Sequence, residues 1–243
     1  MNISGSGSIA AGEYNEKISV SGSGKLNGDI RCVALSCSGA VKGVGSVTCT
    51  ESLSASGGCH FEKDVHAKRI SVSGSCKVGG NIVAEEAVKT SGTLSCGGRL
   101  SCTSLVSSGT LSVGGDIEAE EVRISGAIRC DGLLNAEKVD LCPAGCVGSI
   151  GGSEIRVHMD AYVSENIALR LPLLSKLVGS HHRTHLTVEE LVEGDVVALE
   201  YVTVPKVVGR VVAIGEECVI DLVQYSEEIE IHPKATVKKV EKI

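Results

Sequence analysis

Apolar residues in the first part of the chain come in pairs spaced two apart, with polar or small residues between them. Side chains two apart on an extended strand point to the same face, so each pair predicts a short strand with one buried side. A Ser-Gly dipeptide recurs every 17 or 18 residues and fixes the register of these pairs. Its glycines are Gly5, Gly22, Gly39, Gly57, Gly74, Gly92, Gly109 and Gly126.

Aligning the repeats on that glycine gives a set of apolar columns. Eight residues after it stand Ile30, Val47, Val65, Ile82, Leu100, Ile117 and Leu134. Four residues before it stand Ile18, Leu35, Leu53, Ile70, Val88, Leu105 and Val122. Ten residues after it the column is small and apolar: Cys32, Cys49, Ala67, Ala84, Cys102, Ala119 and Ala136. From the repeat at Gly22 onward, glycine returns six residues after it in every repeat except the one with Lys63, which indicates a corner where the backbone bends and a positive φ is useful.

Each repeat thus holds three short strands separated by three corners. A fixed period of this kind is typical of a repeat protein in which each unit contacts only its neighbours. We predict an all-β fold, a parallel triangular β-helix with coils of 17–18 residues, and a rod of about 38 Å for eight coils. The single Phe and the absence of Trp agree with a narrow lumen filled by small aliphatic side chains and Cys.

The register weakens after the Ser-Gly repeats, and we divide the chain into three parts. Residues 1–159 form the β-helix, residues 160–193 an excursion with an amphipathic segment, and residues 194–243 a C-terminal β segment of further coils or a cap. Val211 and Ile229 are 18 apart, which favours further coils. The excursion carries an apolar stretch that either covers the β-helix or contacts a membrane surface or a partner. Its apolar residues are Leu169, Leu171, Leu173, Leu174 and Leu177.

Seven of the eleven cysteines alternate with Ala, Val and Leu in the inward columns, so we interpret the cysteines as small hydrophobes. Many unpaired thiols indicate a reducing compartment, and neither a signal peptide nor a long apolar run is evident. The sequence therefore favours a cytoplasmic protein. The formal charge of −7 and the few aromatic residues argue against nucleic acid as a partner.

Candidate chemistry is sparse. His181, His182 and His185 are the nearest approach to a metal site, but a polar bend beside Arg183 favours solvated side chains. The Glu pairs at 85–86 and 120–121 recur at equivalent corners, which is typical of solvated turns. We expect no catalytic residue, no metal and no cofactor, and no phosphate-binding loop motif occurs.

The repeat resembles the core of the bactofilins, polymer-forming cytoskeletal proteins of bacteria. The segments 21–30, 73–82 and 108–120 carry the resemblance, each with Ser-Gly followed by Gly-Asp-Ile or Gly-Asn-Ile. The stretches 193–210 and 214–226 are similar to the C-terminal region of bactofilin-like proteins from Gram-positive bacteria. The resemblance implies a right-handed β-helix that assembles end to end into filaments without nucleotide. It also implies a cytoplasmic scaffold, often at the membrane, whose clients are cell-shape, wall or motility (flagellar) machinery.

Elementary physics also favours self-association, because the ends of a β-helix expose unpaired backbone groups and an open apolar lumen. The candidate polymer contacts are Ile3, Ile9, Ile18, Val237 and Val240. We expect N-terminal ends to associate with each other. Lysine at position 9 or 18 should then leave a folded rod but shorten the assemblies.

Two other functions fit the same pattern less well. One is a hexapeptide-repeat acyltransferase with a left-handed β-helix, which needs a strict six-residue period and a histidine base. The period here drifts between 17 and 18, and no histidine has an evident partner. The other is a monomeric adaptor on the same fold.

Overall fold

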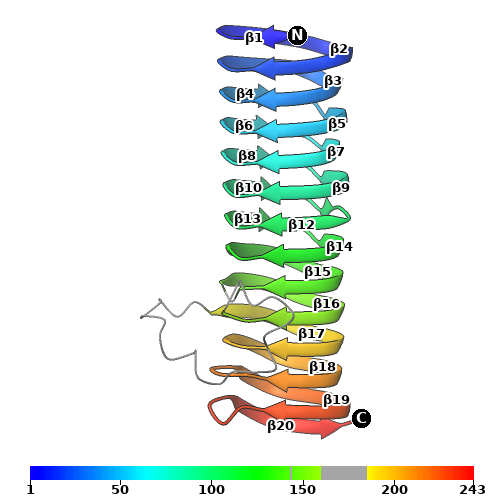
Figure 1. The fold of residues 1–243 in the computed structure, drawn as a ribbon, viewed down its shortest axis with the longest axis vertical. Coiled ribbons are helices and arrows are strands. Elements are labelled where there is room, and N and C mark those ends of the chain that lie inside the picture. Colours follow the sequence, from blue (N-terminus) through cyan, green and yellow to red (C-terminus); the bar gives the residue numbers. More distant parts are fainter. Residues whose placement is uncertain (143, 160–184) are drawn as a thin grey trace, which may run out of the picture.

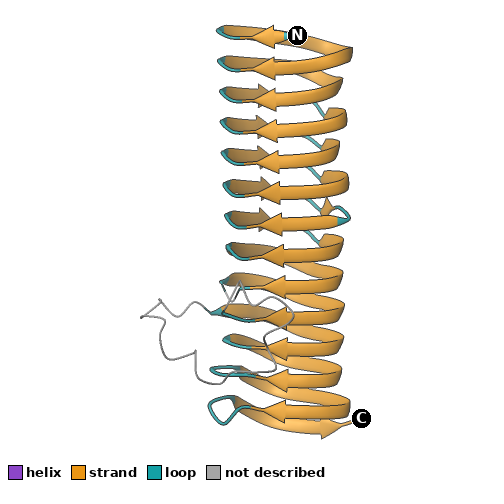
Figure 2. Ribbon diagram, in the orientation of Figure 1, coloured by secondary structure: helices purple, strands orange, loops and turns teal. Residues whose placement is uncertain are grey.

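The computed structural model describes residues 1–142, 144–159 and 185–243. In these residues all regular structure is β, and every strand pairing is parallel. The single sheet winds into a solenoid of about 13 turns, a straight rod with the N-terminus at one end and the C-terminus at the other (Figure 1). Short loops join the strands (Figure 2). The predicted fold class is confirmed.

Twenty strands make up the solenoid. They are β1 (Asn2–Ile3), β2 (Ser6–Val20), β3 (Ser23–Cys37), β4 (Ala40–Gly43), β5 (Val47–Ala55), β6 (Gly58–Phe61), β7 (Val65–Val72), β8 (Ser75–Val78), β9 (Ile82–Thr90), β10 (Thr93–Cys96), β11 (Leu100–Ser101), β12 (Ser104–Ser107), β13 (Thr110–Val113), β14 (Ile117–Ile124), β15 (Ala127–Leu141), β16 (Gly145–Val157), β17 (Leu186–Leu199), β18 (Val202–Ile214), β19 (Val219–Ile231) and β20 (Thr236–Lys242).

The apolar columns read from the sequence line the lumen. The residues eight positions after the Ser-Gly glycine are partners in register from coil to coil and are at most 2% exposed: Ile30, Val47, Val65, Ile82, Leu100, Ile117 and Leu134. Burial alternates strictly along the short strands, as in β4, β6 and β8. The hydrophobic effect therefore acts along the whole axis of the rod, with each coil covering the next.

The Ser-Gly corners need glycine because the coils approach each other closely there. A Cβ atom at Gly39 would lie 1.9 Å from the carbonyl oxygen of Gly22, and one at Gly126 would lie 1.9 Å from that of Gly109. Positive φ is confined, within the described part of the chain, to Gly12, Gly28 and Gly145 among the glycines. Of the glycines six residues after the Ser-Gly glycine, only Gly28 has positive φ, so the expectation that this corner uses positive φ is wrong for the others. At the Ser-Gly dipeptide, stacking of backbone on backbone excludes a side chain.

The second corner is tied by Asp and Asn side chains. In each case a side-chain Oδ1 accepts a hydrogen bond from a backbone N–H of the next coil, which satisfies a donor that the strand ladder leaves open. The four bonds are Ser46 N to Asp29 (2.8 Å), Asn81 N to Asp64 (2.7 Å), Arg99 N to Asn81 (2.9 Å) and Leu133 N to Asp116 (3.0 Å). This explains the Asp or Asn at this corner, which follows glycine in three of these coils and Lys63 in the fourth.

The C-terminal strands continue the same stack. β17 pairs with β16 over most of its length, although residues 160–184 separate them in the sequence. β17 begins at Leu186, inside the range that the sequence assigned to the excursion. The C-terminal segment does form further coils. However, Val211 and Ile229, whose 18-residue spacing suggested them, are not register partners, because Ile229 stacks on Val212 and Val211 stacks on Glu228.

Candidate functional site: the two tips and a lateral groove

The N-terminal tip is formed by β1 and β2. β1 pairs only with Ser19 and Val20 of β2, so residues 6–17 of β2 have a neighbouring strand, β3, on one side alone. This edge is a row of backbone groups that a further strand could use. The N-terminal ammonium group of Met1 lies 2.6 Å from a carboxylate oxygen of Glu16 and donates to the carbonyl oxygen of Lys17 at 2.8 Å.

The isoleucines predicted as N-terminal contacts lie at different depths. Ile9 and Ile18 are buried in the lumen, 1% and 0% exposed. Ile3 and Tyr14 are partly buried and pack against the core, and the Tyr14 hydroxyl donates to the carbonyl oxygen of Ala10 at 2.9 Å. Lysine at position 9 or 18 would place a charge inside the apolar lumen. Because both side chains are buried, we now expect these substitutions to destabilise the rod itself, in contrast to the expectation from the sequence that they leave it folded.

The C-terminal tip exposes more apolar surface. β20 pairs with residues 219–225 of β19, and no described strand lies on its other side. Ile231, Val240 and Ile243 are 38%, 43% and 64% exposed, whereas Val237 is partly buried against the core. Two of the candidate contacts, Val237 and Val240, thus lie together at this tip.

Charged side chains surround this apolar surface. Lys238 Nζ lies 2.7 Å from Asp221 Oδ1, and Lys239 Nζ lies 2.5 Å from Glu241 Oε1. The hydrogen bond from Lys239 is the main reason that the pKa of Glu241 lies below its ordinary value, and Gln224 adds a second hydrogen bond. Lysine on an edge strand is a common device against indiscriminate pairing, so the tip is apolar at its centre and charged at its rim.

Several residues singled out in the sequence lie outside the described residues. They are Leu169, Leu171, Leu173, Leu174, Leu177, His181 and His182. His185 is described: its Nδ1 lies 3.0 Å from the carbonyl oxygen of Tyr201 and its Nε2 lies 3.3 Å from Thr203 Oγ1. Within the described ranges, no three His, Cys, Asp or Glu side chains are grouped as a metal site would require. The same ranges contain no helix of the length and hydrophobicity needed to cross a membrane.

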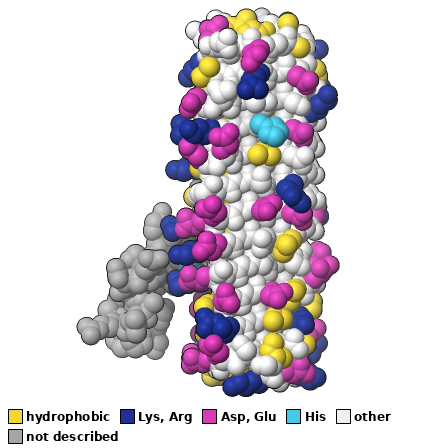
Figure 3. Space-filling view, turned by 90° about the vertical axis from the view of Figure 1, so that its right-hand side faces the viewer, with side chains coloured by type: hydrophobic (Ala, Val, Ile, Leu, Met, Phe, Trp, Pro, Cys, Tyr) yellow, Lys and Arg dark blue, Asp and Glu magenta, His cyan; other side chains and the backbone are white. Residues whose placement is uncertain are grey.

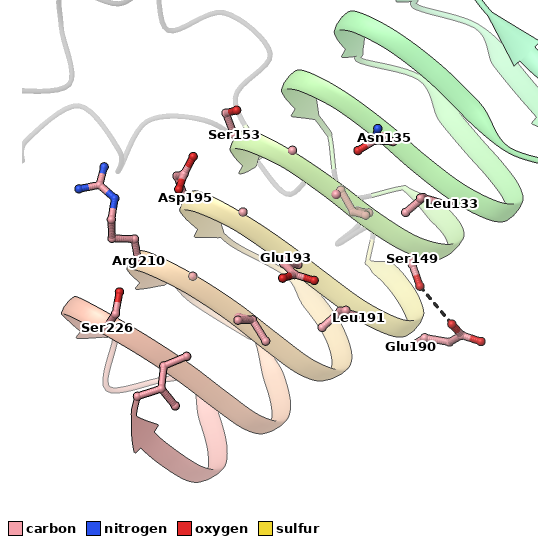
Figure 4. A pocket seen from close by; sticks show the side chains of 17 residues that line it. Leu133, Asn135, Ser149, Ser153, Glu190, Leu191, Glu193, Asp195, Arg210 and Ser226 are labelled. Carbon is pink, nitrogen blue, oxygen red and sulfur yellow. Dashed lines mark hydrogen bonds between the residues drawn. The ribbon is translucent and has the colours of Figure 1, made fainter.

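A lateral groove of about 840 Å³ runs across the strands near the C-terminal end, a feature that the sequence did not indicate. The lining includes Gly152 on β16, Gly194 on β17 and Gly209 on β18, which are register partners in successive coils. Because glycine has no side chain, the surface is hollow where the three residues stack. Figure 4 shows the polar side chains along its sides, and Figure 3 shows apolar side chains gathered toward the C-terminal end of one lateral face. Leu133 and Ile243, both in the lining, are 41% and 64% exposed.

The groove has an acidic side. Glu190, Glu193 and Asp195 line it, and Ser149 Oγ lies 3.2 Å from Glu190 Oε2 (Figure 4). Arg210 is the one basic residue among the described lining residues, and it bonds Glu227 at 2.9 Å. Neither His nor Cys occurs in this described lining, and the groove offers hydrogen-bond acceptors together with apolar contacts.

Eight of the eleven cysteines are buried. The sulfur atoms of Cys32 and Cys49 lie 3.7 Å apart in adjacent coils. Burial raises the pKa of Cys76 to about 12 and that of Cys130 to about 11. Thiols held neutral in this way act as small hydrophobic side chains, in agreement with their alternation with Ala and Val.

Comparison with known proteins adds no relative. No family model matches the sequence, and searches of curated proteins and of solved structures find no match.

Proposed function

We propose that this protein is a bactofilin-like structural scaffold that self-assembles end to end without nucleotide. The observation that carries the proposal is the C-terminal tip, where Ile231, Val240 and Ile243 expose apolar surface beside the open edge of β20. A further coil stacked on this edge would pair its backbone groups and cover these side chains. Both effects are the same ones that hold successive coils together inside the rod.

Of the two tips, the C-terminal one is the stronger candidate for the first contact. At the N-terminal tip Ile3 and Tyr14 already pack over the lumen, and Ile9 and Ile18 lie beneath the surface. An N-terminal contact would therefore depend mainly on backbone pairing along β2. A C-terminal contact would gain apolar burial in addition.

Assembly is tested with a charge at the tip and a matched charge on the side of the rod. Val240→Glu places a carboxylate where Val240 is 43% exposed, and Val106→Glu places one on β12, where Val106 is 38% exposed and far from both tips. Sedimentation velocity and negative-stain electron microscopy should show long assemblies for the natural chain and for Val106→Glu, and single rods or short pieces for Val240→Glu.

Two outcomes would overturn the proposal. Natural protein that sediments as a single rod at all concentrations would favour the monomeric adaptor. Equal shortening by both variants would mean that added charge, and not the tip, controls association. Circular dichroism spectra of the variants should match that of the natural chain, because both positions are partly solvated.

The proposal extends to a cytoplasmic location, to a membrane surface and to client proteins of the cell envelope or flagellar machinery. These parts rest on the resemblance and on the apolar stretch from Leu169 to Leu177. Co-sedimentation with phospholipid vesicles tests the membrane contact, using a variant with Leu173→Ser and Leu174→Ser. Binding that is the same in the variant would exclude this stretch as the anchor.

A further inference from the structure

One face of the solenoid carries a row of basic side chains, one in each of four consecutive coils. The row is formed by Lys25 on β3, Lys42 on β4, His60 on β6 and Lys77 on β8, each the register partner of the next. All four side chains point outward and are exposed. The three short strands lie above one another in the N-terminal half of the rod (Figure 1). We call these four residues the basic row.

Stacking like charges in register is unfavourable for the isolated rod. Neighbouring strands are about 4.8 Å apart, and like charges directly opposite each other on a sheet are destabilising. Of the three lysines in the basic row, only Lys42 forms an ion pair within the described part of the chain, with Glu62 at 3.0 Å. Lys25, Lys42 and Lys77 against Glu62 leave two net positive charges along the row, on a chain of formal charge −7, and the adjacent corner adds Lys63 together with Asp29 and Asp64.

The surface beside the basic row is flat and small. Two residues before each member of the row stand Ser23, Ala40, Gly58 and Ser75, and a Cβ atom added at Gly58 would meet nothing within 4 Å. Asn27 and Asp29 are exposed further along β3. No bulky side chain on these strands therefore stands between the row and a molecule lying along the rod axis.

We propose that the basic row binds a linear phosphate polymer lying along the rod axis. The cations stand in single file, which matches a chain of closely spaced charges, whereas a planar membrane surface would be contacted best by charges spread across the face. Lysine ammonium groups bind phosphate as point charges. Single-stranded nucleic acid fits less well, because Phe61 is buried and His60 is the one exposed ring that these strands offer for stacking on a base. The site is separate from the tips and does not depend on self-assembly.

The probe is short-chain inorganic polyphosphate, with binding measured by isothermal titration calorimetry at low and moderate salt. The test variant carries Lys25→Gln, Lys42→Gln and Lys77→Gln. The matched control carries Lys17→Gln, Lys89→Gln and Lys138→Gln, three exposed lysines on other parts of the rod, so both variants change the net charge equally. We expect affinity to fall at least about tenfold in the test variant and to weaken with added salt in the natural chain.

The control should retain the affinity of the natural chain to within about twofold. The thermal unfolding temperature at low salt should rise slightly in the test variant, since the repulsion within the row is removed. No binding of polyphosphate by the natural chain, or an equal loss in both variants, would overturn the proposal. Binding of the natural chain to anionic phospholipid vesicles, lost in the test variant and without any polyphosphate binding, would also overturn it and identify a membrane as the partner.

Discussion

Phe61 lies directly against Gly43 inside the lumen. The two residues are register partners on β6 and β4, and a Cβ atom at Gly43 would stand 2.9 Å from Phe61 Cδ1. Phe61 is the only phenylalanine of the chain and is 0% exposed. The absent side chain of Gly43 leaves the room that the ring fills, so two neighbouring coils share one volume that neither could pack alone.

We expect this volume exchange to appear as coupling between the two positions. Phe61→Ala should reduce the free energy of unfolding by about 3–5 kcal/mol through the cavity it leaves. Gly43→Ala should reduce it by about 1–3 kcal/mol through overpacking. In the double variant Gly43→Ala with Phe61→Ala, urea denaturation should show a smaller loss than the sum of the two single losses. Strict additivity would contradict shared packing.

A second prediction concerns the Ser-Gly corners. Gly109→Ala would place a Cβ atom 1.9 Å from the carbonyl oxygen of Gly92, so the coils must separate and thermal stability should fall sharply. Gly58→Ala is the matched control, because a Cβ atom there meets nothing and Ala40 stands at the same position of the preceding coil. Its unfolding temperature should stay close to that of the natural chain. Equal effects of both changes would show that backbone entropy, rather than close approach, explains the glycines.

Two hydroxyl groups in the lumen predict stabilising substitutions. Thr90 and Ser107 are partners in adjacent coils, are 4% and 1% exposed, and their hydroxyl oxygens have no hydrogen-bond partner. Thr90→Val and Ser107→Ala should each raise the free energy of unfolding by about 1 kcal/mol, since a buried polar group without a partner is costly. Ser71→Ala, at an exposed position, should change it by less than about 0.5 kcal/mol. A loss of stability in Thr90→Val would mean that the hydroxyl is satisfied in solution.

The buried thiols predict a loss of stability in alkali. Burial raises the pKa of Cys130 and Cys218 to about 11, compared with 9.0 for an ordinary thiol. The unfolded chain therefore releases these protons at lower pH than the folded one. The stability they contribute is fully present below pH 9.0 and is lost as the pH rises toward about 11.

Thermal unfolding measured across this pH range tests the effect. Cys130→Val, which introduces the residue found at position 113 of the preceding coil, should lessen the decline above pH 9.0. The control Ser112→Ala, at a partly exposed position without a thiol, should leave the pH profile unchanged. A profile that is identical in Cys130→Val and the natural chain would show that other groups cause the alkaline loss.

The repeat itself was predictable because every coil solves the same packing problem. Ile30, Val47 and Val65 could be assigned to the lumen from their spacing alone, and the structure buries all three. The tips could not be predicted in the same way. Ile9 and Ile18 follow the periodic pattern, but whether they face a second copy depends on whether Ile3 and Tyr14 cover the lumen, and this is a contact without a repeat.

The lateral groove could not be predicted from the sequence either, because the glycines that form it do not follow the repeat. Gly152, Gly194 and Gly209 are separated by 42 and 15 residues, so no fixed period links them. They meet because β17 stacks on β16 across residues 160–184, and because the coil formed by β17 and β18 is shorter than the earlier ones.

The order of small, apolar and polar residues determined by itself which side chains face inward, since alternation along a strand is a local property of the backbone. Only the tertiary structure showed which residues lie at the two tips of the rod and that β17 stacks on β16 although residues 160–184 separate them in the sequence. Those features depend on where a stack stops and on which strand edges remain without a neighbour, and no local pattern encodes either.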